Sequence, residues 1–346
     1  MLESKVITIT GISGSGSKQF CENYKIQKED VKIYNVGQMI YELAQNTPQE
    51  PAIREKNFLN LSPKLLNTYR DMTFNSIINN LKSDKNNHER IIIDTHAQFL
   101  WNDVYQNAST GKHLNQLGSD LFITIIDKPS SIKENQLRNE QGISQDHDYR
   151  DLLLWQNIEV NQTMEWASNS QKPMYVLPSK QDGIIIDSLL ENDFLIYFQM
   201  PMTDASSSED DEISEFKERL LDVGRKINDE HTPIIDPRHI DIETGKGLSN
   251  KIREAINRQT VMRDEVWYIP QSTTQVAFYP KGSPYSVGVS DESKKGHDTG
   301  KDTFVVLPGR ERLSPFITKS KVFTSVDKFF KVFPKEMEEA MEYYKR

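Results

Sequence analysis

The feature that most constrains this chain is a glycine-rich turn near its first residue. The β-branched run 6–10 is followed by Gly11-Ile12-Ser13-Gly14-Ser15-Gly16-Ser17-Lys18 and then by a polar segment compatible with a helix. Glycine accepts a positive φ without a Cβ clash, so the backbone N–H groups of such a turn converge on one point. A helix that starts there adds the positive end of its dipole. The stretch therefore predicts a strand, a phosphate-binding loop and a helix.

The spacing of this turn is close to that of a P-loop. Gly11 and Gly16 enclose four residues, as the pattern requires, but Ser17 and Lys18 follow where Lys and then Ser or Thr are usual. An ordinary Gly/Ser turn is the alternative, and the place of the turn after the first strand of an α/β pattern favours phosphate binding. The residues predicted to bind nucleotide phosphates are Gly11, Ser13, Gly14, Ser15, Gly16, Ser17, Lys18 and Gln19. Ser17 is also a predicted metal ligand, and Lys18 a predicted catalytic residue.

Composition excludes several classes of partner. The net charge of −9 gives no support to a broad nucleic-acid-binding surface. The single cysteine, Cys21, excludes internal disulfides and fits a reducing compartment. No apolar run approaches the ~20 residues that span a membrane. We therefore expect a cytoplasmic protein with neither a nucleic-acid nor a membrane partner.

Strand-like and helix-like segments alternate along the chain, which is typical of α/β proteins. In the first half, strands are predicted at 6–10, 32–36, 90–96, 121–126 and 174–177, and a long helix starts at Ser62-Pro63. The pattern restarts near residue 193, with strands at 194–198, 233–237, 273–279 and 302–307, a loop at 204–212 and helices at 326–333 and 334–346. We predict a P-loop kinase-like parallel-sheet domain (1–192) followed by a second, smaller Rossmann-like α/β domain (193–346).

Polar residues close the most apolar strand of the first domain. Asp94 and His96 follow an isoleucine run, and the carboxyl ends of parallel strands are where open α/β sheets bind ligands. Asp94 is predicted to hold Mg²⁺ beside the phosphates, and His96 to contact substrate. A hydrogen-bonded structural histidine is the alternative for His96.

Four arginines are candidates for binding phosphate groups. Arg138 and Arg150 flank a polar stretch that we predict to be a lid, whose arginines clamp the transferred phosphoryl group. Arg54 and Arg70 precede it at positions suited to docking an acceptor phosphate. A solvated charged surface is the alternative for Arg138 and Arg150.

The first domain resembles archaeal-type adenylate kinases, a branch of the P-loop nucleoside monophosphate kinases. The resemblance is carried by residues 6–18, by Tyr34-Asn35-Val36-Gly37-Gln38-Met39-Ile40-Tyr41-Glu42, by the Ser62-Pro63 helix and by Ile92-Ile93-Asp94-Thr95-His96. It implies binding of ATP and Mg²⁺, transfer to a nucleoside monophosphate, a substrate-binding role for Gly37, and the homo-oligomers found in that family.

The second domain is similar to nucleoside 2-deoxyribosyltransferases and their nucleotide N-glycosidase relatives. The matching residues are Tyr197, Met200-Pro201, Arg263-Asp264, Ser286-Val287-Gly288-Val289-Ser290-Asp291-Glu292 and Gly300-Lys301. The resemblance implies that Glu292 is the nucleophile at the anomeric carbon, that Asp264 is a second acid and that Tyr197 orients Glu292. It also places Ser286 and Gly288 beside the bound sugar or phosphate.

Together these patterns predict an ATP-dependent, adenylate kinase-like phosphotransferase whose second domain binds a nucleotide and cleaves N-glycosidic bonds. Two alternatives stay open on the sequence. One is a non-catalytic nucleotide-sensing protein with degenerate sites, and the other is a P-loop ATPase module that acts on a partner.

Overall fold

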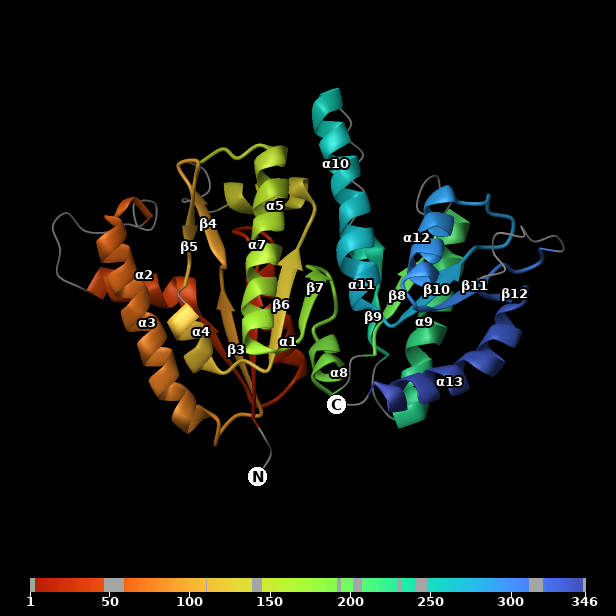
Figure 1. Cartoon of the computed structure of the whole chain (residues 1–346), viewed down its shortest axis with the longest axis horizontal. Coiled ribbons are helices and arrows are strands. Elements are labelled where there is room, and N and C mark those ends of the chain that lie inside the picture. Colours follow the sequence, from red (N-terminus) through yellow and green to blue (C-terminus); the bar gives the residue numbers. More distant parts are fainter. Residues whose placement is uncertain are drawn as a thin grey trace. The chain divides into compact units, whose positions relative to one another are not determined.

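The computed structural model of the chain describes residues 4–46, 59–109, 111–138, 145–191, 194–201, 207–228, 232–240, 248–310 and 320–344. The described residues divide into two compact units, Met1–Gly183 with Ile240–Ile256 and Ile184–His239 with Asn257–Arg346. Each unit contains its own five-stranded parallel sheet (Figure 1). The chain therefore has the predicted fold class, a P-loop kinase-like α/β domain followed by a second, smaller Rossmann-like one.

The sheet of the first unit has the phosphate-loop strand at its centre. Its strands are β1 (Lys5–Thr10), β2 (Val31–Asn35), β3 (Arg90–Thr95), β6 (Leu121–Ile126) and β7 (Met174–Pro178). They lie in the order β2-β3-β1-β6-β7, which is 2-3-1-4-5 along the chain, and each neighbouring pair is parallel. Strands β1, β3 and β6 are buried along nearly their whole length because helices cover both faces. The five strands predicted for this domain are confirmed.

The helices of the first unit connect these strands. They are α1 (Ser17–Gln27), α2 (Val36–Asn46), α3 (Pro63–Asp84), α4 (Gly111–Leu117), α5 (Pro129–Leu137) and α7 (Tyr149–Ser170). Helix α3 starts as predicted, with the Ser62 hydroxyl accepting the Leu65 N–H at 3.4 Å and Pro63 in the first turn. Helix α7 packs against β6 and β7, in front of the sheet in Figure 1.

The start of α2 corrects one sequence-based expectation. The second strand was predicted to extend to residue 36, but it ends at Asn35, and Gly37 lies in the first turn of α2. The Asn35 side chain causes the early start, because its Oδ1 accepts the Gln38 N–H at 2.8 Å as a helix cap does.

A short hairpin after β3 was not predicted from the sequence. Strands β4 (Gln98–Trp101) and β5 (Val104–Asn107) pair antiparallel around a two-residue turn. Asn102 and Asp103 form this turn with φ of 48° and 59°, the left-handed conformation that such hairpin turns require. Because four-residue strands carry little periodicity, only this Asn-Asp pair signalled the hairpin.

The second unit has a sheet with a different strand order. Its strands are β8 (Ile196–Gln199), β9 (Ile234–Ile235), β10 (Thr274–Phe278), β11 (Asp302–Val306) and β12 (Lys321–Phe323). The order β12-β11-β10-β8-β9 corresponds to 2-1-3-4-5 read from the β9 edge, and all described pairs are parallel. The chain reverses direction across the sheet between β8 and β10, the position at which doubly wound sheets bind ligands. Strand β12 was not predicted.

Two predictions for the second half are wrong: the loop, over the described residues 207–212, and the division of the last helix at Pro334. The remaining helical segments are α8 (Ile185–Glu191), α9 (Ser207–Asn228), the 3₁₀ turn η2 (Pro237–His239), α10 (Asn250–Met262), the π-helical η3 (Arg263–Tyr268), α11 (Ile269–Gln271), α12 (Val287–Asp298) and α13 (Val326–Tyr343). Residues 207–212 begin α9 instead of forming a loop, since acidic residues are favourable in a first turn. Residues 326–343 form one helix, because burial of Phe329, Phe333 and Met337 outweighs the cost of Pro334 inside it.

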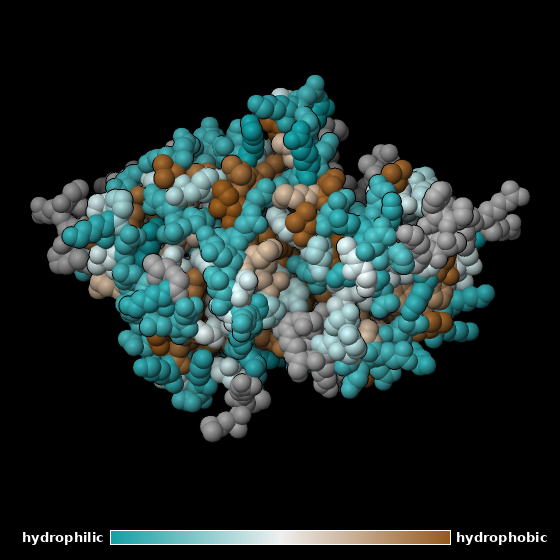
Figure 2. Space-filling view, in the orientation of Figure 1, coloured by the Kyte–Doolittle hydropathy of each residue, from teal (hydrophilic) through white to brown (hydrophobic). Residues whose placement is uncertain are grey.

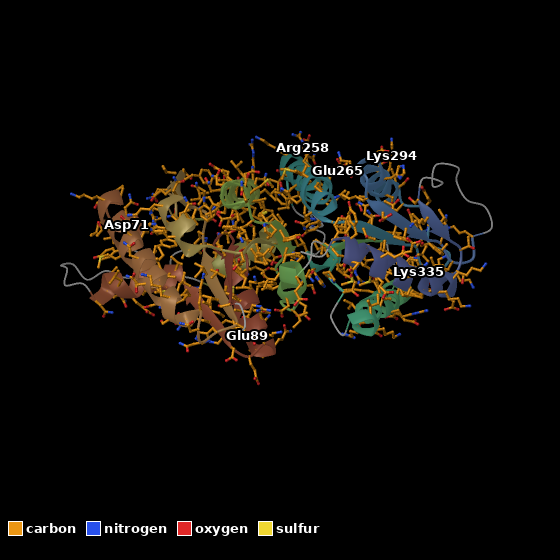
Figure 3. All side chains as sticks on the ribbon, turned by 60° about the horizontal axis from the view of Figure 1, so that its bottom comes forward. Asp71, Glu89, Arg258, Glu265, Lys294 and Lys335 are labelled. Atoms are coloured by element: carbon orange, nitrogen blue, oxygen red, sulfur yellow. The ribbon has the colours of Figure 1, made fainter. Side chains whose placement is uncertain are left out.

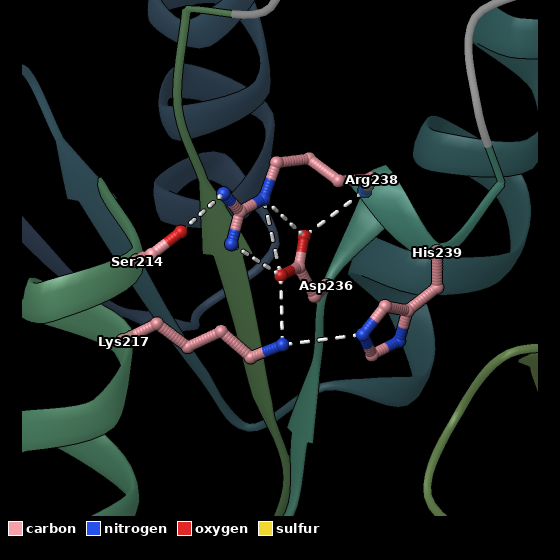
Figure 4. A network of polar contacts seen from close by, with 5 residues as sticks. All are labelled: Ser214, Lys217, Asp236, Arg238 and His239. Carbon is pink, nitrogen blue, oxygen red and sulfur yellow. Dashed lines mark hydrogen bonds and ion pairs between the residues drawn. The ribbon is translucent and has the colours of Figure 1, made fainter. Parts of the chain in front are cut away.

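A buried ion-pair network follows β9. Asp236 accepts hydrogen bonds from Arg238, with an Nη2–Oδ2 distance of 2.8 Å, and its Oδ2 lies 2.9 Å from Lys217 Nζ (Figure 4). Burial opposes ionisation of Asp236, but the bonds from Arg238 and the charges of Lys217 and Arg238 outweigh it and lower the pKa to about 2. The network therefore ties α9 to the end of β9.

One face of the molecule is largely hydrophilic (Figure 2). Hydrophilic side chains predominate on the face shown in Figure 2, and hydrophobic ones form small, separated patches. None of the helices in the described part of the chain combines the length and the apolarity that crossing a bilayer requires.

Candidate functional sites

The turn between β1 and α1 has the shape of a phosphate loop. Gly14 and Gly16 have φ of 88° and 90°, which only glycine adopts without strain. A Cβ on Gly14 would lie 2.7 Å from the Ile132 carbonyl oxygen, so space also requires glycine there. From the outside, the side chains of Asn135 and Gln136 donate to the carbonyls of Gly14 and Ser13 at 2.9 and 2.7 Å. Helix α5 thus holds the loop by its carbonyls.

Several backbone N–H groups of the loop have no hydrogen-bond acceptor among the described residues. In the described residues, the Gly11 N–H donates to Glu159 and the Ser15 N–H to Ile12. The N–H groups of Gly14, Gly16 and Ser17 meet no acceptor there, and no side chain caps α1. Lys18 and Gln19 continue the open first turn of the helix, with exposed side chains. The predicted loop therefore offers several convergent donors at a helix N-terminus, where an anion binds.

Asp94 closes β3 next to this turn. Its register partners are Ile9 on β1 and Asn35 on β2, and Asn35 Nδ2 donates to its Oδ2 at 2.7 Å. Burial raises the pKa of Asp94 to about 6, while a hydrogen bond from Ser17 and the charge of Lys18 oppose the rise. The structure thus brings together Asp94, Ser17 and Lys18, as predicted, and adds Asn35, which the sequence did not single out.

A second carboxyl group, which the sequence analysis missed, anchors the base of the loop. Glu159 on α7 is fully buried and accepts the N–H groups of Gly11 (3.1 Å), Ala97 (2.7 Å) and Gln98 (2.8 Å). Burial raises its pKa to about 8, against the effect of these three donors. A signal was present, because Glu159 lies on the face of α7 that also buries Leu152, Trp155 and other residues. A carboxyl group on an otherwise apolar helix face indicates that it forms hydrogen bonds in the protein interior.

His96 and Arg70 lie beside each other below the loop. Burial lowers the pKa of His96 to about 4, the charge of Arg70 adds to this effect, and a hydrogen bond to the Gly11 backbone opposes it. The His96 ring packs against Phe99 at 4.3 Å between centroids. His96 is therefore neutral near pH 7 and lies close to Gly11 at the start of the loop. Arg70 also lines a polar cavity.

The other predicted residues of this unit are more dispersed. Arg138 caps the C-terminus of α5 and Arg150 lies in the first turn of α7, both with exposed side chains. They bracket 139–144, which lie outside the described residues, so their clamp role stays a prediction. Arg54 also lies outside the described residues. Gly37 is exposed on α2, and a Cβ there would meet only Asn35 Oδ1, at 3.8 Å.

The residues around the loop fit a nucleotide-bound Mg²⁺ but not a protein-only metal site. Among the described residues, no cluster of three or more His, Cys, Asp and Glu side chains is suited to a metal. Asp94 and the Ser17 hydroxyl supply two oxygens next to the loop, and Mg²⁺ is commonly held by one carboxylate together with substrate phosphates.

The second unit groups three predicted residues at its own site. Tyr197 on β8 is buried and hydrogen-bonds to both Asp264 and Glu292. Asp264 lies in the π-helical turn η3 and is paired with Arg263, whose Nε is 2.9 Å from its Oδ1. Single π-helical turns are frequent at functional sites. Strand, turn and helix α12 therefore converge here, beside the point where the strand order reverses.

The pKa values of both carboxyl groups in this cluster, Glu292 and Asp264, are raised. Burial and the nearby charge of Asp264 raise the pKa of Glu292 above its ordinary value. Burial also raises the pKa of Asp264, but the charge and hydrogen bonds of Arg263 oppose that rise. Asp264 is paired directly with Arg263, and the pKa of Glu292 is raised to about 8.

The start of α12 is open at the predicted ligand side. Ser286 caps the helix, its hydroxyl accepting the Val289 N–H at 3.4 Å. Gly288 is exposed, and a Cβ on it would meet only Ser286 Oγ, at 3.8 Å. The predicted contacts of Ser286 and Gly288 with a sugar or phosphate stay predictions.

Comparisons with known proteins agree with a nucleotide-binding loop. A family model described as an AAA domain matches residues 10–152, which include the loop and Asp94. No curated protein sequence matches the chain.

Solved structures similar to this chain cover about half of it. An uncharacterized protein from Eubacterium ventriosum ATCC 27560 is 11% identical with a TM-score of 0.31, over 54% of this chain and 98% of that one. A sugar kinase from Janibacter sp. HTCC2649 is 13% identical with a TM-score of 0.29, over 54% and 90%. The tunicamycin resistance protein of Deinococcus radiodurans is 13% identical with a TM-score of 0.27, over 49% and 96%.

Proposed function

We propose that the first unit transfers a phosphoryl group from ATP to a nucleoside monophosphate. The observation that carries the proposal is the set of N–H groups of Gly14, Gly16 and Ser17, which have no acceptor among the described residues and lie at the start of α1 next to a buried carboxyl group. Donors fixed in this way bind phosphate oxygens without reorganisation, and fixed donors are the main contribution a protein makes to phosphoryl transfer.

The residues around the loop have different roles in the proposed reaction. The loop amides hold the phosphates of ATP, with Lys18 adding a positive charge at the edge of the loop. Asp94 and Ser17 would hold Mg²⁺, which supplies neutralising charge to the phosphates when bound. Arg138 and Arg150 clamp the transferred group from the two ends of the predicted lid. Glu159 keeps the ends of β1 and β3 in place by accepting their N–H groups.

The acceptor lies on the side of the loop where the sheet ends in neutral His96. An imidazole with a pKa of about 4 binds as a neutral partner at pH 7, so it hydrogen-bonds to a base or hydroxyl group without adding charge. Gly37 leaves the first turn of α2 open toward an approaching ligand. A cytoplasmic location, where ATP is abundant, is part of the proposal.

Turnover with a panel of acceptors tests this function. The full chain is incubated with ATP, Mg²⁺ and each common nucleoside monophosphate, and diphosphates are separated by chromatography. Production of two diphosphates that requires an acceptor, and that disappears in Asp94→Asn, supports the proposal. ATP hydrolysis without any acceptor would replace it by an ATPase module. ATP binding without product would replace it by a nucleotide sensor.

We propose as a second activity that the second unit cleaves N-glycosidic bonds. The supporting observation is Tyr197, buried between the carboxyl groups of Glu292 and Asp264, of which Asp264 is paired with Arg263. Ionised Glu292 would attack the anomeric carbon while the bond to the base breaks, and water supplies the proton that the departing base takes up. A second water molecule then hydrolyses the sugar–Glu292 ester, which releases the sugar and restores the carboxylate. Because Glu292 holds its proton, the rate rises with pH as that group ionises.

Base release measures the second activity. Nucleosides and nucleoside monophosphates are incubated with the wild type, with Glu292→Gln and with Asp291→Asn as the neighbouring control. Free base should appear with the wild type and the control and not with Glu292→Gln. Equal release by all three, or release by none, would rule out this role of Glu292.

A further inference from the structure

The first unit contains a polar cavity outside the phosphate loop. It has a volume of about 550 Å³ and lies between α3, α4, the end of β5 and α7. Its lining residues are Asn67, Arg70, Asp71, Asn107, Ser109, His113, Gln162, Glu165, Trp166 and Asn169. None of these belongs to the phosphate loop, so the cavity is a separate place. Its volume is in the range that holds small molecules.

Arg70 gives this cavity an unmatched positive charge. The residue is only 7% exposed, and its Nη1 donates to Asn67 at 3.0 Å. Its Nη2 is buried and has no acceptor among the described residues, and no carboxylate there lies within ion-pair distance. Burial lowers the pKa of Arg70. A buried guanidinium without a counter-charge is costly, so the geometry favours an anion that completes it.

The rest of the wall suits hydroxyl groups. The Ser109 hydroxyl is buried and also lacks a partner among the described residues. Gln162 Nε2 donates to Glu165, an exposed carboxylate that keeps further acceptor capacity. Asp71, labelled on α3 in Figure 3, is 57% exposed and lies 3.3 Å from His113 Nε2. Carboxylate and amide oxygens at a rim accept the hydroxyl hydrogens of a sugar, as an acidic residue does for ribose.

The two negative side chains do not cancel the charge of Arg70. Asp71 and Glu165 are exposed and hydrated, whereas Arg70 is buried. Burial lowers the pKa of His113, while Asp71 opposes that shift, so the imidazole adds little positive charge near pH 7. The cavity thus has a cation at depth and hydroxyl acceptors at its mouth.

We propose that this cavity binds a phosphate monoester carried on a sugar. The phosphate group would lie on Nη2 of Arg70, with a further hydrogen bond from Ser109, and the sugar hydroxyls would face Asp71, Glu165 and the amides. A nucleoside monophosphate and a simple sugar phosphate share this chemistry. Because the sequence also predicts that Arg70 docks an acceptor phosphate, this inference extends the proposed function. Binding to the cavity is measured without ATP, so it can succeed or fail whatever the outcome of the turnover assay.

Calorimetric titration of the full chain tests this site. The protein carries Gly14→Ala, so that the phosphate loop does not contribute, and the probes are AMP, ribose 5-phosphate, adenosine and inorganic phosphate. At least one of the two monoesters should bind more tightly than adenosine and phosphate. The stronger monoester identifies the source, nucleotide or sugar phosphate. Absence of monoester binding, or equal binding of adenosine, would overturn the proposal.

Variants of the wall separate binding from folding. Arg70→Met should weaken the monoester by about 10- to 100-fold, the usual value of a hydrogen bond to a charged group. It should not lower the melting temperature, because it removes a buried unpaired charge. Lys82→Met changes an exposed lysine on the same helix and should leave binding unchanged. Ser109→Ala gives a second, milder loss. If Arg70→Met folds and binds as the wild type does, the proposal is wrong.

Discussion

Replacing Gly14 by alanine is the sharpest test of the phosphate loop. Gly14 has a φ of 88°, and alanine in this region costs about 1–2 kcal/mol in free energy. The added Cβ would also lie 2.7 Å from the Ile132 carbonyl oxygen and 3.0 Å from Gln136 Cγ. The carbonyl belongs to α5 and cannot rotate away as a flexible side chain does. The loop must therefore move, and its N–H groups lose their common direction.

The chain provides a matched control at Gly118. That glycine also has a positive φ, 60°, but a Cβ there would meet nothing within 4 Å. Gly118→Ala thus pays a similar backbone cost without displacing a neighbour. Both variants should lower the free energy of unfolding by about 1–2 kcal/mol from strain alone, and Gly14→Ala by somewhat more.

Binding of ATP separates the two variants. Several N–H to phosphate bonds are lost in Gly14→Ala, each with a value of about 1.5–3 kcal/mol, so we expect ATP affinity to fall at least about 10-fold. Gly118→Ala should bind ATP as the wild type does. Titration calorimetry measures affinity, and urea denaturation measures stability. Equal ATP affinity of Gly14→Ala and the wild type would show that the loop does not hold phosphates.

Three further predictions concern buried carboxyl groups. The pKa of Asp94 is raised to about 6, so the folded protein loses stability as pH rises from about 4 to 6. Asp94→Asn should therefore be more stable than the wild type by up to about 3 kcal/mol above pH 6. In urea titrations without ligand, this difference should vanish toward pH 4. Glu159→Ala leaves up to three buried N–H groups without an acceptor and should lower the free energy of unfolding by about 3 kcal/mol or more. Glu165→Gln, on the same helix, should lower it by less than about 0.5 kcal/mol. Equal effects of the two variants in denaturation would contradict the anchoring role of Glu159. The pKa of Asp236 is lowered to about 2, so its contribution of about 2.4 kcal/mol to the free energy of unfolding is present above pH 4 and lost between pH 4 and 2. Asp236→Asn should remove this acid-induced loss of stability, which denaturation at a series of pH values measures.

The phosphate loop and the strands of the first sheet could be predicted because their signals are local. A glycine that needs a positive φ, such as Gly14, can be recognised from the residues next to it in the sequence. The same holds for an unbroken apolar run, such as 91–93. The same applies to the Ser62 cap. The hairpin at 98–107 and strand β12 were missed, since strands of three or four residues carry too little periodicity.

Helix ends in the second half depended on contacts far away in the sequence. Pro334 marks a break by local rules, yet the helix continues through it because Phe329, Phe333 and Met337 bury one continuous face. The acidic start of α9 is read equally well as a solvated loop or as a favourable first turn. Packing of the helix against the sheet decided between the two.

By itself, the sequence determined the α/β class, the glycine turn and the acid at the end of the third predicted strand, because each depends on backbone conformation and on neighbouring side chains. The tertiary structure alone placed Glu159 under the loop, 148 positions from Gly11, and left Arg70 with an unmatched charge beside a cavity. The reason is physical: burial and the partners of a polar group are properties of the packed chain, and no local pattern specifies which distant residue will accept a given hydrogen bond.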